Sequence, residues 1–295
     1  MDKKVAIIGS GIAGLSASVF LSQKYDIHLF EKNKILGGHT RTINFKDNLR
    51  RISIDTGFIV FNDKNYPDLK SFFDYLNVTT LKSSMSFAVS SVKPNIEYGG
   101  SNLNTLFAQR KNFFSFKFIS LLVEIKKLYS IGRNVYLNNF DKNLTIEEFL
   151  INNNFSKEIR FLHIYPMISA IWSTNTVDVE NFPLISFLEF FNNHGLFDLN
   201  NRPEWKFVKG GSYEYVKAII KKNLFNVNIN YKIKKIIRNE NKILLIDNNN
   251  NIKKFDKVVF ATHADQALQL LDKPSADEIK ILSKFQYTKN KAFLH

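Results

Sequence analysis

A glycine-rich turn near the start of the chain constrains the fold more than any other feature. Apolar residues 4–8 are expected to form a short buried strand, residues 15–24 a helix and residues 26–30 a second strand. The turn between the first strand and the helix fits the pattern GxGxxG and consists of Gly9, Ser10, Gly11, Ile12, Ala13 and Gly14. A strand, this turn, a helix and a strand within about 30 residues predict a dinucleotide-binding unit.

The three glycines and the acid that follows them have separate physical roles in such a unit. Gly9 allows the tight turn, Gly11 lets a pyrophosphate approach the backbone, and Gly14 permits close packing of helix on strand. The phosphates then lie at the positive end of the helix dipole. Glu31 ends the second strand, where a carboxylate accepts hydrogen bonds from ribose hydroxyls and repels a 2′-phosphate. This pattern favours FAD or NAD over NADP, and we include the adjacent Lys32 among the expected cofactor contacts.

Composition excludes several classes of function. The chain has 295 residues, of which 44% are hydrophobic and 23% charged, as in a globular protein of one or two domains. No segment approaches the roughly 20 apolar residues of a membrane span, so neither a transmembrane helix nor a signal peptide is expected. Because the chain has no cysteine, disulfides, iron–sulfur clusters, thiolate zinc sites and the redox cysteine pair of a disulfide reductase are excluded.

The chain is strongly basic, with a formal net charge of +14 and a pI of about 9.6. Its lysines are scattered and no nucleic-acid motif accompanies them, so we expect no nucleic-acid partner. A basic surface can also attract anionic lipid or an acidic substrate.

Further elements follow from periodicity and capping. We expect an amphipathic helix from Pro67, another over 113–129 that is either core-facing or membrane-lying, and a kinked buried helix around Pro166 in 164–172. Capping boxes predict helix starts at Thr145 and Ser275. In the last third we expect a helix to about Lys222, a strand over 227–237, a hairpin of 243–246 with 252–255, and a strand over 257–261.

Several motifs together resemble a known family. Besides the glycine turn and Glu31, they are Gly37-Gly38, Asp55-Thr56-Gly57 and residues 258–262 (VVFAT). They resemble the flavin amine-oxidase and phytoene-desaturase superfamily, and most of all its bacterial branch of predicted NAD/FAD-binding oxidoreductases. Stretches such as 55–62, 106–110, 170–174 and 261–268 extend the similarity along the chain.

The resemblance implies FAD as the cofactor and assigns residues to it. Glu31 would bind the adenosine ribose, and the turn Thr56, Gly57 and Phe58 would approach the isoalloxazine. Ile233 would meet the adenine through its backbone, and a strand ending in Ala261 and Thr262 would lie beneath the cofactor. The glycine pair Gly37 and Gly38 would lie along the pyrophosphate and ribityl region, His39 would lie near the flavin side, and Thr40 is included among the expected cofactor contacts. The resemblance also implies a longer protein, so we expect this chain to be a fragment that lacks a last cofactor-binding segment.

The sequence names no obligatory catalytic side chain, because FAD itself carries the redox chemistry. His39 and Trp172 are the candidates, against the alternatives of a surface histidine and a core aromatic. His163 and Tyr165 are open to the same two readings, pocket lining or core packing. No metal is predicted, since His194 and His263 lack ligand spacing, and hydrolysis has no supporting motif.

These observations predict an α/β flavoprotein with a Rossmann-like FAD-binding domain over 1–64 and 205–272, and an inserted α+β substrate domain over 65–204 and 273–295. The expected function is FAD-dependent dehydrogenation or desaturation of an apolar substrate, for which a fatty-acyl chain is one hypothesis. The alternatives are amine oxidation and a peripheral membrane protein in which FAD is structural. We expect a cytoplasmic protein, or one at the inner face of the membrane, whose oligomeric state the sequence leaves open.

Overall fold

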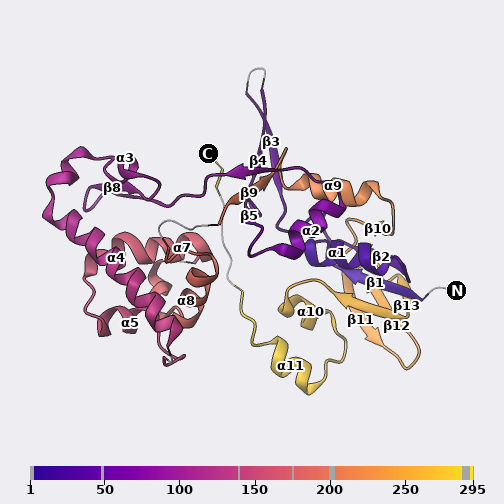
Figure 1. The fold of residues 1–295 in the computed structure, drawn as a ribbon. Helices are drawn as coiled ribbons and strands as arrows, with labels where there is room; N and C mark the ends of the chain where they lie inside the picture. Colours follow the sequence, from indigo (N-terminus) through magenta and orange to yellow (C-terminus); the bar gives the residue numbers. More distant parts are fainter. Residues whose placement is uncertain are drawn as a thin grey trace. The chain divides into compact units, whose positions relative to one another are not determined.

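The computed structural model describes residues 3–47, 50–138, 140–174, 176–198, 203–287 and 293–294. The chain forms two compact units (Figure 1). The first comprises Met1–Phe61, Asp68–Leu81 and Lys206–His295, and the second comprises Asn62–Pro67 and Lys82–Trp205.

A parallel four-stranded sheet organises the first unit. Its strands lie in the order β10 (Asn226–Asn228), β2 (Asp26–Phe30), β1 (Lys4–Ile8) and β14 (Lys257–Phe260), and every pair is parallel. Helix α1 (Ile12–Leu21) connects β1 to β2. Because parallel strands run in one direction, their carboxyl ends meet at one edge, which is where ligands bind in such folds.

Layers cover both faces of this sheet, and alternate residues of β1 supply the two cores. Val5 and Ile7 pack with α1, α2 (Pro67–Tyr75) and α9 (Tyr213–Lys221). Ala6 and Ile8 pack with the antiparallel sheet of β11 (Ile233–Arg238), β12 (Ile243–Asp247) and β13 (Ile252–Phe255). Val5 to Ile8 are all buried, as expected of a strand covered on both faces. The predicted α/β, Rossmann-like architecture is confirmed.

Several smaller elements belong wholly or partly to the first unit. They are the hairpin β3 (Thr42–Asp47) and β4 (Arg50–Asp55), the three-stranded sheet of β5 (Phe61–Asn62), β9 (Trp205–Val208) and β6 (Thr80–Ser83), and the helices α10 (Ala264–Leu270) and α11 (Ala276–Leu282).

Two element predictions for this unit need correction. The helix expected over 15–24 begins at Ile12 and ends at Leu21, because the last glycine of the turn is already helical. The single strand expected over 227–237 is two strands, β10 and β11, which belong to different sheets. The chain turns between them at Asn230, whose φ of 52° lies in the left-handed region that asparagine tolerates.

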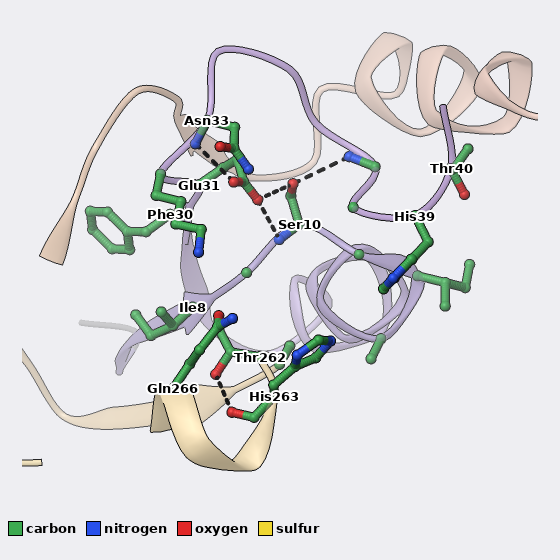
Figure 2. A pocket seen from close by; sticks show the side chains of 18 of the residues that line it. Ile8, Ser10, Phe30, Glu31, Asn33, His39, Thr40, Thr262, His263 and Gln266 are labelled. Carbon is green, nitrogen blue, oxygen red and sulfur yellow. Dashed lines mark hydrogen bonds between the residues drawn. The ribbon is translucent and has the colours of Figure 1, made fainter. Parts of the chain in front are cut away.

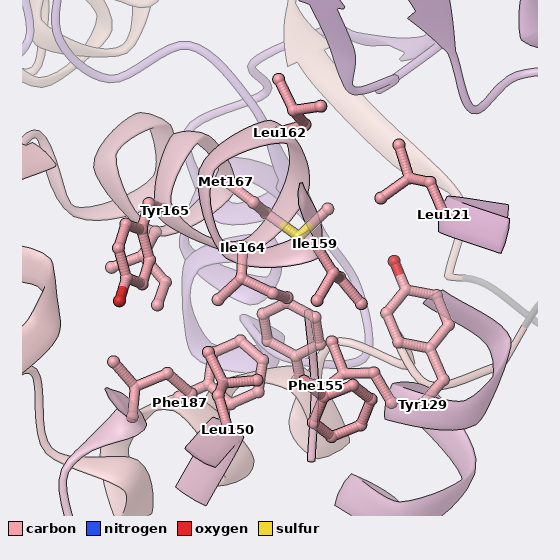
Figure 3. Packing of buried hydrophobic residues seen from close by; sticks show 14 of the residues in the cluster. Leu121, Tyr129, Leu150, Phe155, Ile159, Leu162, Ile164, Tyr165, Met167 and Phe187 are labelled. Atoms are coloured by element: carbon pink, nitrogen blue, oxygen red, sulfur yellow. The ribbon is translucent and has the colours of Figure 1, made fainter. Parts of the chain in front are cut away.

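The second unit is mainly helical around one apolar core (Figure 3). Its elements are β7 (Ala88–Ser91), β8 (Ile96–Gly99), α3 (Leu103–Leu106), the 3₁₀ turn η1 (Arg110–Phe114), α4 (Phe116–Leu137), α5 (Ile146–Asn152), α6 (Lys157–Ile159), the π turn η2 (Arg160–Ile164), α7 (Tyr165–Trp172), the 3₁₀ turn η3 (Thr176–Asn181) and α8 (Leu184–Asn193).

The capping boxes at Thr145 and Ser275 are confirmed, and Pro166 lies in the first turn of α7. The helix expected over 113–129 instead begins after Ser115, which caps it, and continues to Leu137.

The division into units differs from the expected domain bounds at two places. Helix α2 belongs to the first unit because Phe72 and Phe73 pack in its core, Phe73 edge-on against Phe61. The segment after 272 also belongs there, since Arg238 of β11 donates to both carboxylate oxygens of Glu278 at 2.6 and 2.9 Å. The functional labels given to the two units stay predictions.

No helix in the described part of the chain is both long enough and apolar enough to cross a membrane.

Candidate functional site

A cavity of about 740 Å³ opens in the first unit at the carboxyl ends of β1, β2 and β14 (Figure 2). Its volume is within the range of small-molecule and cofactor sites. It is lined by Ile8, Gly9, Ser10, Gly11, Ile12, Ala13, Phe30, Glu31, Lys32, Asn33, Gly37, Gly38, His39, Thr40, Phe58, Leu69, Tyr215, Tyr231, Lys232, Ile233, Ala261, Thr262, His263, Gln266, Gln269 and Leu270.

The three glycines of the first turn meet different surroundings. Gly9 has a φ of 101°, and a β-carbon there would lie 2.6 Å from the carbonyl oxygen of Ala261. A β-carbon on Gly14 would collide with the carbonyl oxygen of Gly9. In contrast, nothing lies within 4 Å of a β-carbon placed on Gly11. Gly9 and Gly14 are therefore required by packing, whereas Gly11 keeps its side of the cavity open.

Glu31 is joined to the turn through Ser10. The Ser10 hydroxyl donates to Glu31 Oε2 at 2.6 Å, and the Ser10 backbone N–H donates to the same oxygen at 3.1 Å (Figure 2). The other carboxylate oxygen, Oε1, accepts from the backbone N–H of Asn33 at 2.9 Å. Glu31 is only 6% exposed, and no basic side chain of the described chain forms an ion pair with it in the structure. The carboxylate oxygens keep acceptor capacity for further donors, such as ribose hydroxyls.

The second glycine pair closes over the first turn. The Gly37 backbone N–H donates to the Ser10 carbonyl at 3.0 Å and lies 3.2 Å from the Ser10 hydroxyl. Gly37 and Gly38 have φ values of 110° and 60°, and a β-carbon on Gly38 would lie 3.0 Å from Gly11 Cα. Both positions therefore need glycine for their backbone conformation. In addition, Gly38 approaches Gly11 closely, and a β-carbon on Gly37 would lie 2.8 Å from the Thr40 carbonyl oxygen.

His39 and Thr40 extend this loop along the cavity. The Thr40 hydroxyl lies 2.6 Å from the Tyr215 hydroxyl of α9, and both side chains are buried. Burial raises the pKa of Tyr215, so its hydroxyl stays protonated. His39 is exposed, and its ring stacks with the His263 ring at a centroid distance of 6.1 Å.

The predicted turn Thr56 to Phe58 lies behind this loop, and only Phe58 lines the cavity. The Phe58 backbone N–H donates to the His39 carbonyl at 3.2 Å. A β-carbon on Gly57 would collide with that same carbonyl. Gly57 thus lies directly against His39 from outside the cavity, and Thr56 donates its backbone N–H to the Arg41 carbonyl at 3.0 Å.

The segment between β10 and β11 forms the wall beside Glu31. The Tyr231 backbone N–H donates to the Glu31 carbonyl at 2.9 Å, and the Asn230 N–H donates to the Asn33 carbonyl at 2.9 Å. The Tyr231 ring packs against Phe30 with centroids 5.0 Å apart. Burial, assisted by the nearby Asp247 carboxylate, raises the pKa of Tyr231 to about 12. These contacts bring the predicted Ile233 to the cavity.

The opposite wall follows β14. Ala261 continues the sheet by donating its N–H to the Ile8 carbonyl at 2.8 Å, and Thr262 follows it at the cavity. The His263 ring also stacks on the Tyr287 ring, with centroids 4.2 Å apart, and the Tyr287 hydroxyl accepts from the Ala264 N–H at 3.0 Å.

The structure therefore brings most of the predicted cofactor residues to one cavity. The exceptions are Gly14, Thr56 and Gly57, which do not line it. The catalytic candidate Trp172 belongs to the second unit, where it packs between Phe182 and Phe190. His163 and Tyr165 are buried in the core of the second unit. Within the described chain, no three acidic or histidine side chains gather as a metal site would require.

Sequence reasoning missed part of the lining, namely Ile8, Phe30, Asn33, Leu69, Tyr215, Tyr231, Lys232, His263, Gln266, Gln269 and Leu270. His263 could have been inferred, because it follows the end of a parallel strand and such ends share one edge. Tyr215 carries no comparable local signal.

Comparison with known proteins supports the fold. A family model described as an NAD(P)-binding Rossmann-like domain matches residues 7–76. No curated protein matches the chain significantly. Among solved structures, the chain is similar to cyclohexylamine oxidase from Brevibacterium oxydans IH-35A, at 16% identity and a TM-score of 0.69. The chain shares its fold.

Two other solved structures have the same arrangement. They are putrescine oxidase with bound putrescine, at 16% identity and a TM-score of 0.66, and the CLA-producing fatty acid isomerase from P. acnes, at 18% identity and a TM-score of 0.59. In all three comparisons 96% of this chain is covered. The chain spans 63% of the length of the two oxidases and 64% of that of the isomerase.

Proposed function

We propose that this chain binds FAD in the cavity at the carboxyl ends of β1, β2 and β14, as part of a flavin-dependent oxidoreductase. One observation carries the proposal: the open side of Gly11 and the carboxylate of Glu31 face the same cavity of about 740 Å³. A pyrophosphate needs the first and a ribose needs the second. FAD, when bound, supplies an acceptor for a hydride.

The residues present fit such a cofactor. The backbone N–H groups at the start of α1 would hold the pyrophosphate, and Glu31 would hold the adenosine ribose. Tyr231 and Ile233 would enclose the adenine. The flavin end would then extend past Gly38 toward His39 and the aromatic Phe58. The chain's own residues thereby orient the cofactor along one edge of the sheet.

For the reaction, we propose removal of a hydride from an apolar substrate by dehydrogenation or desaturation, with a fatty-acyl chain as the substrate hypothesis. The net charge of +14 favours an anionic substrate such as a fatty carboxylate over a cationic one. Similarity in fold to a fatty acid isomerase supports the same substrate class.

Amine oxidation is the second candidate, because the two amine oxidases match this chain with higher TM-scores than the isomerase does. A basic protein, however, repels a protonated amine at long range. A third candidate, of another class, is a peripheral membrane protein in which FAD is structural.

The cofactor is tested first. The purified protein should show the two-band visible spectrum of oxidised flavin. Glu31→Gln should bind FAD at least about tenfold more weakly, which corresponds to about 1.4 kcal/mol. Exposed Glu240→Gln, which removes the same charge elsewhere in the first unit, should leave FAD affinity unchanged. A colourless protein that takes up no added FAD would refute the proposal.

Substrate class is tested separately. Under anaerobic conditions the flavin should be bleached by free fatty acids or acyl lipids, and mass spectrometry of the acyl chains should show loss of two hydrogens. Bleaching by amines, with release of hydrogen peroxide in air, would replace the acyl hypothesis by amine oxidation. Bound flavin that neither class reduces would favour the structural role.

A further inference from the structure

The start of α4 and the turns before it expose an unusual set of apolar side chains in the second unit. Phe114 is 95% exposed and Phe116 is 87% exposed. We group them with the other exposed apolar side chains of α3, η1 and the start of α4, and call this set the aromatic edge, defined as Leu103, Phe113, Phe114, Phe116, Ile119 and Val123. Exposed apolar patches of this kind mark interaction sites more often than chance positions.

Local packing holds the aromatic edge in place. Phe113 stacks on the buried Phe107 with centroids 3.8 Å apart. The Arg110 guanidinium donates to the Phe107 carbonyl at 2.9 Å, which ties η1 to the end of α3. Ser115 then caps α4, since its hydroxyl accepts from the Phe118 N–H.

The same helix also has an apolar face toward the core. Phe118 and Leu121 are each 1% exposed and pack in the apolar core of the second unit. A helix with one face in the core normally turns polar residues outward. In the first turns of α4, Phe116, Ile119 and Val123 take those outward positions instead. Core packing therefore does not account for them.

Charge identifies the kind of partner. Residues 98–123 contain Arg110, Lys111 and Lys117 and no aspartate or glutamate. Lys111 and Lys117 are exposed beside the aromatic residues. A second copy of this chain would bring like charges together, whereas an anionic lipid surface would neutralise them. Aromatic side chains flanked by lysines are the arrangement that inserts at the boundary between headgroups and acyl chains.

We propose that the aromatic edge is a docking surface for an anionic lipid bilayer, with Phe114 and Phe116 inserted and Lys111 and Lys117 against the headgroups. This proposal does not depend on FAD or on the reaction. It places the second unit at the surface from which an apolar substrate could be drawn.

Vesicle co-sedimentation of the full chain tests the proposal. The protein should bind vesicles of phosphatidylcholine and phosphatidylglycerol mixed three to one, and bind phosphatidylcholine alone at least tenfold more weakly. The double variant Phe114→Ser, Phe116→Ser should lose at least tenfold in binding. A control pair, Ile279→Ser and Ile281→Ser in α11, removes two exposed apolar side chains (47% and 57% exposed) from the first unit and should bind like the parent.

Two further variants separate the contribution of the lysine charges from that of aromatic insertion. Lys111→Gln with Lys117→Gln should weaken binding to the anionic vesicles and leave binding to phosphatidylcholine unchanged. In the Phe114→Trp variant, the fluorescence of the added indole should be quenched when the vesicles contain brominated lipid. Binding to neither vesicle, equal binding by the serine double variant, or a change of oligomeric state in that variant without lipid would overturn the proposal.

Discussion

The Asp55 carboxylate accepts both the backbone N–H and the hydroxyl of Ser212, a residue 157 positions later in the chain, at 2.8–2.9 Å. The same carboxylate accepts from the Thr42 hydroxyl at 2.5 Å, and that hydroxyl accepts from the Tyr213 N–H. Asp55 thereby fastens the base of the β3–β4 hairpin to the start of α9, the helix that presents Tyr215 to Thr40.

Asp55→Asn should lower the free energy of unfolding by about 1–3 kcal/mol, because an amide offers one acceptor oxygen where the carboxylate offers two. Urea unfolding measures the change. Exposed Asp178→Asn serves as the control and should stay within about 0.5 kcal/mol of the parent. Equal stability of the Asp55 variant would mean that the hairpin needs no such fastening.

The first unit shows which parts of the fold can be predicted from the sequence. Strand β1, the glycine turn, α1, β2 and Glu31 are all local, since periodicity and glycine spacing within about 30 residues specify them. The contact of Asp55 with Ser212 depends instead on how distant segments pack. The local sequence around Asp55 or Ser212 does not predict that the two residues are in contact.

The cavity also combines residues that local patterns predict with residues that only long-range packing brings there. Its glycines and Glu31 follow from a spacing rule, but Tyr215 reaches Thr40 across 175 positions. The single strand expected over 227–237 was wrong because its apolar pattern continues through the turn at Asn230. That turn brings Tyr231 to the cavity, so the missed boundary and the missed lining residue have one cause.

An added methyl group should lower the free energy of unfolding at Gly14 but leave it unchanged at Gly11. Gly14→Ala should cost about 1–3 kcal/mol of unfolding free energy, since its β-carbon would collide with the Gly9 carbonyl. Gly11 has a φ of −65°, which alanine adopts freely, and its β-carbon would meet no atom. Gly11→Ala should therefore keep its stability within about 0.5 kcal/mol.

Under the proposed function, the Gly11→Ala methyl group would still occupy the place of the pyrophosphate. FAD affinity, measured by fluorescence titration, should fall at least about tenfold. A stable Gly11→Ala protein with unchanged FAD affinity would place the phosphates elsewhere. A Gly14→Ala protein as stable as the parent would show that α1 can shift away from β1.

Tyr215→Phe tests the support of the loop that carries His39. Removing the hydroxyl leaves the buried Thr40 hydroxyl without that partner, which should cost about 1–3 kcal/mol in urea unfolding. Because Thr40 adjoins His39 at the cavity, FAD affinity should fall several-fold as well. Tyr25→Phe in the same unit is the matched control. A loss of stability without any effect on FAD would separate the loop from the cofactor.

His163 should make the second unit sensitive to acid. Tyr98 donates its hydrogen to the Leu162 carbonyl at 2.8 Å, so the Tyr98 oxygen is left to accept from His163 Nδ1–H at 2.9 Å. His163 Nε2 can then accept from the Tyr129 hydroxyl at 3.1 Å. This arrangement satisfies a neutral imidazole, and burial lowers the pKa of His163 to about 3.

An unfolded chain binds a proton at this histidine near pH 6.5, whereas the folded chain does not until about pH 3. The free energy of unfolding is therefore unaffected by this histidine above about pH 6.5. It decreases as the pH falls from about 6.5 toward 3, with a slope of up to about 1.4 kcal/mol per pH unit. Urea unfolding between about pH 7 and pH 4 measures this slope. His163→Gln, which keeps a donor and an acceptor but cannot titrate, should reduce the slope, and His28→Gln should leave it unchanged. An unchanged slope in His163→Gln would assign the acid sensitivity to other groups.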